Sequence, residues 1–182
     1  LGDSIYKNFN EKFWNEEESF LYDFINKNIK NKNVRPNQIF ALSLPFPVID
    51  QKDKMVKIMD VVIKELYTSF GLRTLSDMDV NFKGKCEGGA TAREIAVHDG
   101  TVWPWTIGFF ITAYIRTFGK GEDSIRFLET VFYPFFEHLF SAGLGTISET
   151  FDGSFPYKPR GRISHAWAVA EFLRAYFEHY LD

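Results

Sequence analysis

The sequence is poor in several features that mark large classes of proteins, and the first of these is cysteine. Cys86 is the only cysteine among 182 residues, which excludes an internal disulfide framework. A lone thiol fits a reducing compartment, so we expect a cytoplasmic protein.

The chain also lacks a strong charge of either sign and a long hydrophobic run. Its formal net charge of −3 gives no electrostatic attraction to nucleic acid. The most apolar stretch, residues 101–115, is shorter than the roughly 20 residues that span a bilayer, and Pro104 lies near its start. We therefore expect neither nucleic acid nor a membrane as a partner, and interpret this stretch as a buried helix.

Motifs for bound cofactors are missing as well. Neither a P-loop nor a G-x-G-x-x-G turn occurs, and no serine stands in a nucleophile elbow. The histidines form no H-E-x-x-H pair and have no cysteine partners at zinc-binding spacing. These absences predict a protein without a metal and without an organic cofactor.

Aromatic residues, by contrast, are abundant. They make up 18% of the chain, with 20 Phe, 8 Tyr and 4 Trp. Phenylalanine mostly builds cores, whereas tryptophan and tyrosine near polar loops can form flat platforms for ligands. The length and the 45% share of hydrophobic residues fit one globular domain with a sizeable core.

Apolar residues recur at helical spacing along most of the chain, and no segment alternates as a strand would. The segments expected as helices are residues 5–29, 37–44, 51–67, 101–118, 123–141 and 164–180. Pro36 suits a first helical turn, an Asp or Ser cap precedes the fifth helix, and Ser164 is a candidate N-cap for the last. On that last helix we expect Trp167 in the core. The pattern predicts an all-α fold.

The links between these helices differ in length. Residues 46–50 and 119–122 form tight links, whereas residues 68–100 and 143–163 far exceed the usual loop of about 4–6 residues. In an up-and-down array alternate links share one end, so the long loops should meet at the end opposite the tight turns. Because long loops in a compact domain are usually functional, that end is the candidate site.

The long-loop end collects residues suited to a neutral ligand with many hydroxyl groups. Carboxylates and arginines can bind hydroxyls, and aromatic rings can cover the apolar faces of sugars. The residues concerned are Arg35, Arg73, Glu87, Arg93, His98, Asp99, Trp103, Trp105, Glu149, Asp152, Tyr157 and His165.

Five motifs across nearly the whole chain resemble a known family. They are RPNQIFALSLP (35–45), GLRTLS (71–76), HDGTVWPW (98–105), ISETFDG (147–153) and HAWAVAEFLRAY (165–176). In this order they resemble the C-terminal half of the amylo-α-1,6-glucosidase domain of archaeal and bacterial glycogen debranching enzymes. The resemblance implies an (α/α)6 toroid, of which residues 1–182 would form about half as helical hairpins of one catalytic domain.

The resemblance also implies a reaction. The family hydrolyses the α-1,6-linked branch-point glucose of glycogen limit dextrin with inversion, using two carboxylates. Glu149 in ISETFDG matches the general base. The general acid belongs to a W-G-R-D segment that does not occur in this chain, so we expect the isolated chain to release no glucose.

The resemblance and the chemistry of the long-loop end together nominate a set of residues for substrate binding. These are Arg73, His98, Asp99, Trp103, Trp105, Asp152 and His165. The chain departs from the family at sugar-contact positions. It has His98-Asp99 where His-Gln is usual, His165 where Gln is usual, and Arg93-Glu94 where Arg-Asp is common.

Several of these residues also have a structural interpretation. Asp152 can serve as a turn residue before a glycine, and Arg35 and Arg73 can hold loops together through carboxylates. One of the two rings beside Pro104 is expected to pack inward. His98 and His165 are equally well explained as residues that form structural hydrogen bonds.

Two other functions stay open. The same toroid serves glucoamylase- or trehalase-like exo-glycosidases, and a helical module can bind carbohydrate without catalysis. Half of a closed ring would expose apolar helix faces, so we also expect self-association or a missing N-terminal segment.

Overall fold

The structure, a computed structural model, describes residues 1–181, and helices are its main secondary structure. The helices are α1 (Gly2–Phe13), η1 (Pro36–Ile39), α2 (Phe40–Ser43), α3 (Lys52–Glu65), α4 (Ala90–His98), α5 (Thr106–Phe118), α6 (Glu122–His138), α7 (Ala166–Ala175) and η2 (Tyr176–Leu181). The helices predicted over residues 37–44, 51–67, 123–141 and 164–180 are therefore confirmed in type, with shifted ends.

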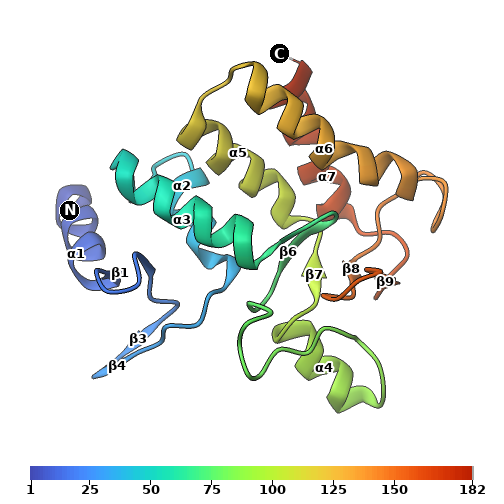
Figure 1. Cartoon of the computed structure of the whole chain (residues 1–182), viewed down its shortest axis with the longest axis horizontal. Coiled ribbons are helices and arrows are strands. Elements are labelled where there is room, and N and C mark those ends of the chain that lie inside the picture. Colours follow the sequence, from blue (N-terminus) through green and yellow to red (C-terminus); the bar gives the residue numbers. More distant parts are fainter. Residues whose placement is uncertain (182) are drawn as a thin grey trace.

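Helix α5 lies at the centre of the helical array (Figure 1). It contacts α2, α3, α6 and α7, and its residues Ile107, Phe110, Ile111 and Ala113 are fully buried. Such a helix, apolar on most of its faces, is stable only when neighbours surround it. The buried helix predicted from the most apolar stretch is thus confirmed.

Helices α5 and α7 approach each other closely at Gly108. A Cβ atom at this position would lie 2.8 Å from the carbonyl oxygen of Glu171 and would also meet the Glu171 carboxylate. Only a residue without a side chain allows this contact, so Gly108 sets the distance between the two helices.

Three small antiparallel sheets accompany the helices, so the expectation of an all-α fold was wrong in this respect. The largest sheet has the order β5 (Tyr67–Thr68), β6 (Gly71–Arg73), β7 (Val102–Trp103), β8 (Thr150–Phe151), β9 (Pro159–Arg160). Its strands come from the two long loops and from the segment before α5. Strands this short contain no alternation of apolar and polar residues that a sequence pattern could reveal.

The large sheet and α4 lie together at one end of the helices, while the link between α5 and α6 lies at the other end (Figure 1). The register pairs Leu72 with Trp103, Val102 with Phe151, and Thr150 with Arg160. The long loops therefore meet at one end, as the lengths of the links predicted.

The N-terminal region differs from the prediction. A single helix over residues 5–29 was expected, but α1 ends at Phe13. The Oδ1 atom of Asn15 accepts the backbone N–H groups of Glu17 and Glu18, and this local bonding competes with a helix. The chain turns there, so that β1 (Trp14–Asn15) pairs with β2 (Phe20–Leu21) and β3 (Ile25–Asn26) pairs with β4 (Ile29–Lys30).

The structure differs from the predicted helices at three further places. Helix α4 lies inside the segment predicted as a loop, strand β7 replaces the expected first turn of α5, and α7 begins after His165 instead of Ser164. No side-chain cap bond starts α6 or α7, so their expected caps are absent from the described residues.

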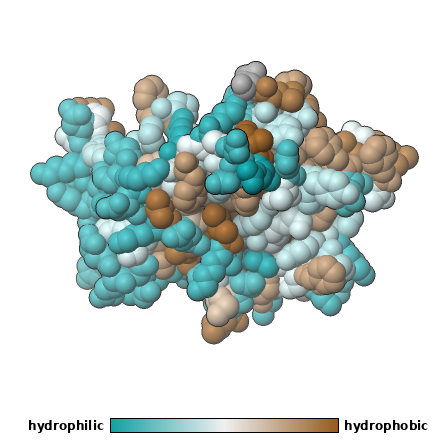
Figure 2. All heavy atoms as spheres, turned by 45° about the horizontal axis from the view of Figure 1, so that its top comes forward, coloured by the Kyte–Doolittle hydropathy of each residue, from teal (hydrophilic) through white to brown (hydrophobic). Residues whose placement is uncertain are grey.

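Apolar patches interrupt the hydrophilic surface (Figure 2). Tyr133, Phe136 and Phe140, on α6 and just after it, are among the exposed large apolar residues. The self-association expected from the sequence stays a prediction. Among residues 1–181, none of the helices is both long and apolar enough to cross a membrane.

Candidate functional site

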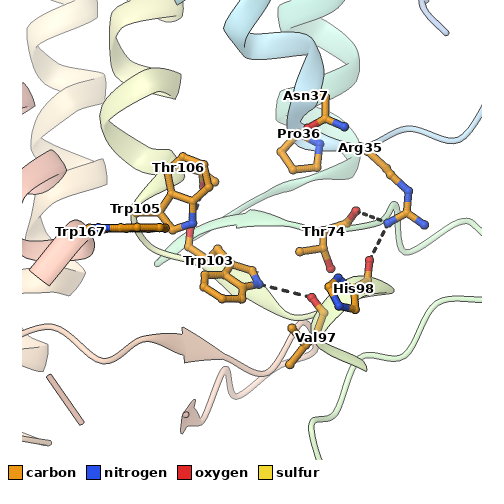
Figure 3. Close-up of a pocket in the computed structure, with 10 residues that line it drawn as sticks. All are labelled: Arg35, Pro36, Asn37, Thr74, Val97, His98, Trp103, Trp105, Thr106 and Trp167. Atoms are coloured by element: carbon orange, nitrogen blue, oxygen red, sulfur yellow. Dashed lines mark hydrogen bonds between the residues drawn. The ribbon is translucent and has the colours of Figure 1, made fainter. Parts of the chain in front are cut away.

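A hollow of about 330 Å³ opens at the sheet end of the helices (Figure 3). The residues that line it come from the start of η1, the residue after β6, the end of α4, strand β7, and the starts of α5 and α7. Segments far apart in the sequence thus build one cavity, and the sheet holds them together.

Tryptophans form one wall of the hollow. The rings of Trp105 and Trp167 meet edge to face with centroids 6.3 Å apart, and Trp105 stacks on Phe40 at 5.8 Å. The indole N–H of Trp103 donates to the carbonyl of Val97 at 3.3 Å. Trp103 and Trp105 are both half-buried and both line the hollow, so the expected split into an inward and an outward ring is not found.

The expectation that Trp167 lies in the core was wrong. The side chain is 66% exposed and lines the hollow. Trp167 is the second residue of α7, directly after the long loop, and its ring lies beside that of Trp105 (Figure 3). In the sequence, only the position of Trp167 next to that loop could have indicated that its side chain is exposed.

Arg35 forms the opposite wall and is held by three neighbours. Its guanidinium donates to the carbonyls of Thr74 (2.9 Å) and His98 (2.6 Å) and to the Asp99 carboxylate (2.7 Å). The interpretation of Arg35 as a loop-holding residue therefore agrees with its contacts. Asp99, nominated for substrate binding, has one carboxylate oxygen in this ion pair.

Two histidines were nominated for substrate binding, and one of them, His98, lines the hollow. His98 is exposed, and its Nε2 lies 3.2 Å from the carboxylate of Glu94. The ring of His165 lies between Trp103 (6.2 Å) and Trp167 (5.6 Å). Within residues 1–181 the buried Nδ1 of His165 has no hydrogen-bond partner. Unpaired buried nitrogens of this kind are rare in folded proteins.

Glu149 lies directly before β8, opposite the turn that follows β9. Its backbone N–H donates to the carbonyl of Arg162 (2.8 Å), and its Oε2 accepts the backbone N–H of Arg162 (2.9 Å). Gly161 has a positive φ of 64°, and a Cβ atom there would lie 2.6 Å from Oε2. The half-buried carboxylate is thus seated on a backbone turn that only glycine permits without displacing it.

Glu149 is not among the residues that line the hollow. The strand that follows it, β8, pairs with β7, which contributes Trp103 to the lining. The pairing of Val102 with Phe151 sets β8 beside β7, which ends in Trp103. Glu149 therefore directly precedes the strand that pairs with the strand of Trp103.

Asp152 and Arg73 have surroundings different from those expected of substrate contacts. Asp152 is 3% exposed, and its oxygens accept bonds from the Cys86 backbone N–H and, at both oxygens, from Arg160. Arg73 is 8% exposed and donates to the carbonyls of Gly153 and Glu65. Because both side chains are enclosed by the protein, the geometry supports a structural role for each.

The sequence motifs did not single out His138. This residue holds Ser148, the residue before Glu149, by a hydrogen bond. Its Nε2 accepts the backbone N–H of Ser148 at 3.3 Å, and burial lowers the pKa of its imidazole. A neutral ring is required for this bond, since a protonated Nε2 could not accept. Within the described residues, no three His, Cys, Asp or Glu side chains are grouped to hold a metal ion.

Two solved structures share the fold. A neutral trehalase from Saccharomyces cerevisiae matches with a TM-score of 0.64 and 14% identity, over 93% of this chain and 28% of that one. A chain described as a sialidase matches with a TM-score of 0.68 and 17% identity, over 97% of this chain and 16% of that one. The present chain therefore spans less than a third of either protein, and it corresponds to part of the (α/α)6 toroidal glycosidases with small sheets added.

The sequence itself matches the model of one protein family, described as amylo-alpha-1,6-glucosidase, over residues 1–174. This range contains η1, strand β7 with Trp103, and the hairpin of β8 and β9 that seats Glu149. The match covers nearly all of the chain, and it includes every segment that lines the hollow. The chain belongs to the amylo-alpha-1,6-glucosidase family.

Proposed function

We propose that the complete protein hydrolyses the α-1,6-linked glucose at branch points of an α-glucan, with inversion at the anomeric carbon. The observation that carries the proposal is the pairing of Val102 with Phe151. It brings the strand after Glu149 next to the strand that ends in Trp103, one of the aromatic residues that line the hollow.

The hollow suits the end of a sugar chain. Its volume of about 330 Å³ is near the lower limit of ligand pockets, which run from about 300 to 1,000 Å³. The tryptophan rings that line it can cover the apolar face of a pyranose.

Glu149 takes the part of the general base in this proposal. The Arg162 backbone N–H binds Oε2 and leaves Oε1 to take a proton from the attacking water. In inverting hydrolysis the second carboxyl group lies about 6.5–9.5 Å away and protonates the leaving oxygen. We assign this acid to a part of the protein outside residues 1–182, since the chain has no W-G-R-D segment.

The test replaces Glu149 by Gln in the complete protein and follows glucose release from limit dextrin. We expect kcat to fall by about 10²–10⁴-fold, because the amide keeps the shape and loses the basicity. KM should change little, and the wild-type product should be the β-anomer by NMR. Glu11→Gln, which alters an exposed carboxylate on α1, is the matched control. Full turnover by the Glu149→Gln protein would refute the proposal.

The same assay separates the other functions. Faster cleavage of linear malto-oligosaccharide or trehalose than of limit dextrin would indicate an exo-glycosidase of another specificity. Glucan binding without turnover, unchanged by Glu149→Gln, would indicate a non-catalytic module. We expect the isolated 182-residue chain to release no glucose.

A further inference from the structure

An ion pair between the buried Asp152 and the half-buried Arg160 lies on the hairpin that carries Glu149. The guanidinium of Arg160, on β9, donates from Nε to Asp152 Oδ1 (2.9 Å) and from one terminal nitrogen to Oδ2 (2.8 Å). Such a two-point contact between planar groups fixes orientation as well as distance. The pair therefore locks the end of β8 to β9.

The position of Arg160 in turn determines how Glu149 is held. Thr150 pairs with Arg160 in the sheet, and Glu149 bonds twice to the backbone of Arg162, two residues farther along. Gly161 lies between them and lets the carboxylate rest against the backbone. A shift of β9 would move this turn, and the carboxylate of Glu149 would move with it.

The same ion pair reaches the wall of the sugar hollow. Asp152 Oδ1 also accepts the backbone N–H of Cys86 (2.9 Å), and Arg160 also bonds the Glu87 carboxylate (2.6 Å). These two residues lead into α4, whose last turn carries Val97 and lines the hollow. The ion pair is thus a joint between the segment with the proposed base and the segment that borders the sugar.

We propose that Asp152 and Arg160 are positioning residues, which hold Glu149 at its working distance from a sugar bound in the hollow. The proposal rests on the function proposed above. Neither side chain contacts the sugar. A displacement of about 1 Å is enough to cost roughly 10²-fold in rate, whereas the tryptophans that bind the sugar keep their places. Loss of the pair therefore lowers kcat and leaves KM nearly unchanged.

The experiment uses the complete protein with Asp152→Asn, which keeps the size of the side chain and removes the charge that binds Arg160. We expect kcat on limit dextrin to fall by about 10²-fold and KM to stay within about twofold. Binding of a malto-oligosaccharide, measured by calorimetry, should also be unchanged. Glu122→Gln, which breaks the exposed ion pair with Arg126 on α6, is the matched control and should leave both constants unchanged.

Arg160→Lys gives a graded second measurement, and it decides the question if Asp152→Asn does not fold. Lysine keeps the charge but cannot make the two-point contact, so kcat should lie between the values of the wild type and of Asp152→Asn. A normal kcat in well-folded variants would overturn the proposal, because the pair would then only stabilise the fold. A rise in KM as large as the fall in kcat would overturn it too, since it would indicate a sugar contact.

The outcome with Glu149→Gln keeps this proposal separate from the function proposed above. If Glu149→Gln is inactive while Asp152→Asn is fully active, only the positioning role fails. If Glu149→Gln is fully active, the proposed function fails, and the positioning role fails with it.

Discussion

At the scale of single residues, two tryptophans show how surroundings decide what a side chain does. Trp14 is buried against the core, whereas Trp167 is two-thirds exposed and touches Trp105 only at its edge. The same residue type therefore serves stability at one position and is available to a ligand at the other.

We expect Trp167→Ala to change the free energy of unfolding by no more than about 0.5 kcal/mol, as is usual for surface positions. The affinity for a malto-oligosaccharide should fall by about 3–10-fold, in line with about 0.5–1.5 kcal/mol for an aromatic contact. Trp14→Ala, the matched variant, should cost about 3–5 kcal/mol of stability. Urea unfolding and calorimetry measure the two quantities, and equal losses of stability in the two variants would contradict this assignment.

The sequence motifs located most of the candidate site but not its supports. Trp103, Trp105 and Glu149 were nominated from their motifs, and the pairing of β7 with β8 brings these two motifs together. Arg160 and Gly161 were not recognised as supports of the site, because their importance depends on a hairpin register that no local pattern reveals. Whether a charged residue such as Asp152 meets solvent or a buried partner is likewise decided by tertiary contacts.

At the scale of elements, the long periodic helices were predictable, and the short, locally bonded segments were not. Helices α3 and α6 repeat apolar residues over several turns, so their pattern is unambiguous. The residues after α1 carry a similar apolar content, but Asn15 bonds its own neighbours and Lys27 adopts a positive φ. These local preferences override the approximate helical spacing.

The contact between α5 and α7 gives a test at the same scale. We expect Gly108→Ala to destabilise the protein by about 1 kcal/mol, since overpacking costs about 1–3 kcal/mol and the better helix propensity of alanine returns part of it. Gly2→Ala, in α1, is the control, because a Cβ there meets nothing within 4 Å. Thermal or urea unfolding of both variants measures these changes in stability. A Gly108→Ala protein more stable than the wild type would show that the helices can move apart freely.

At the scale of the whole molecule, the buried His138 and the half-buried His179 link stability to pH. Burial lowers the pKa of both His138 and His179 from the ordinary value of 6.5. The unfolded chain therefore takes up protons near pH 6.5, while the folded chain does so only at lower pH. By linkage, stability falls as the pH decreases through this window and is fully present above it.

We expect the free energy of unfolding in urea to be lower at pH 5.5 than at pH 7.5, and His138→Gln to reduce this difference. Because glutamine cannot take up a proton, the pH dependence is the informative quantity, whatever the change in stability at neutral pH. An undiminished pH dependence in His138→Gln would mean that this ring is not responsible.

The register of the large sheet also bears on how the chain folds. Its pairings join Arg73 to Val102 and Val102 to Phe151, so each closes a long segment of chain, whereas the helices form from neighbouring residues. Contacts between distant residues form slowly because the loop entropy is lost before the contact is made. During refolding the helices should therefore appear first, and Glu149 should reach its seat among the last steps.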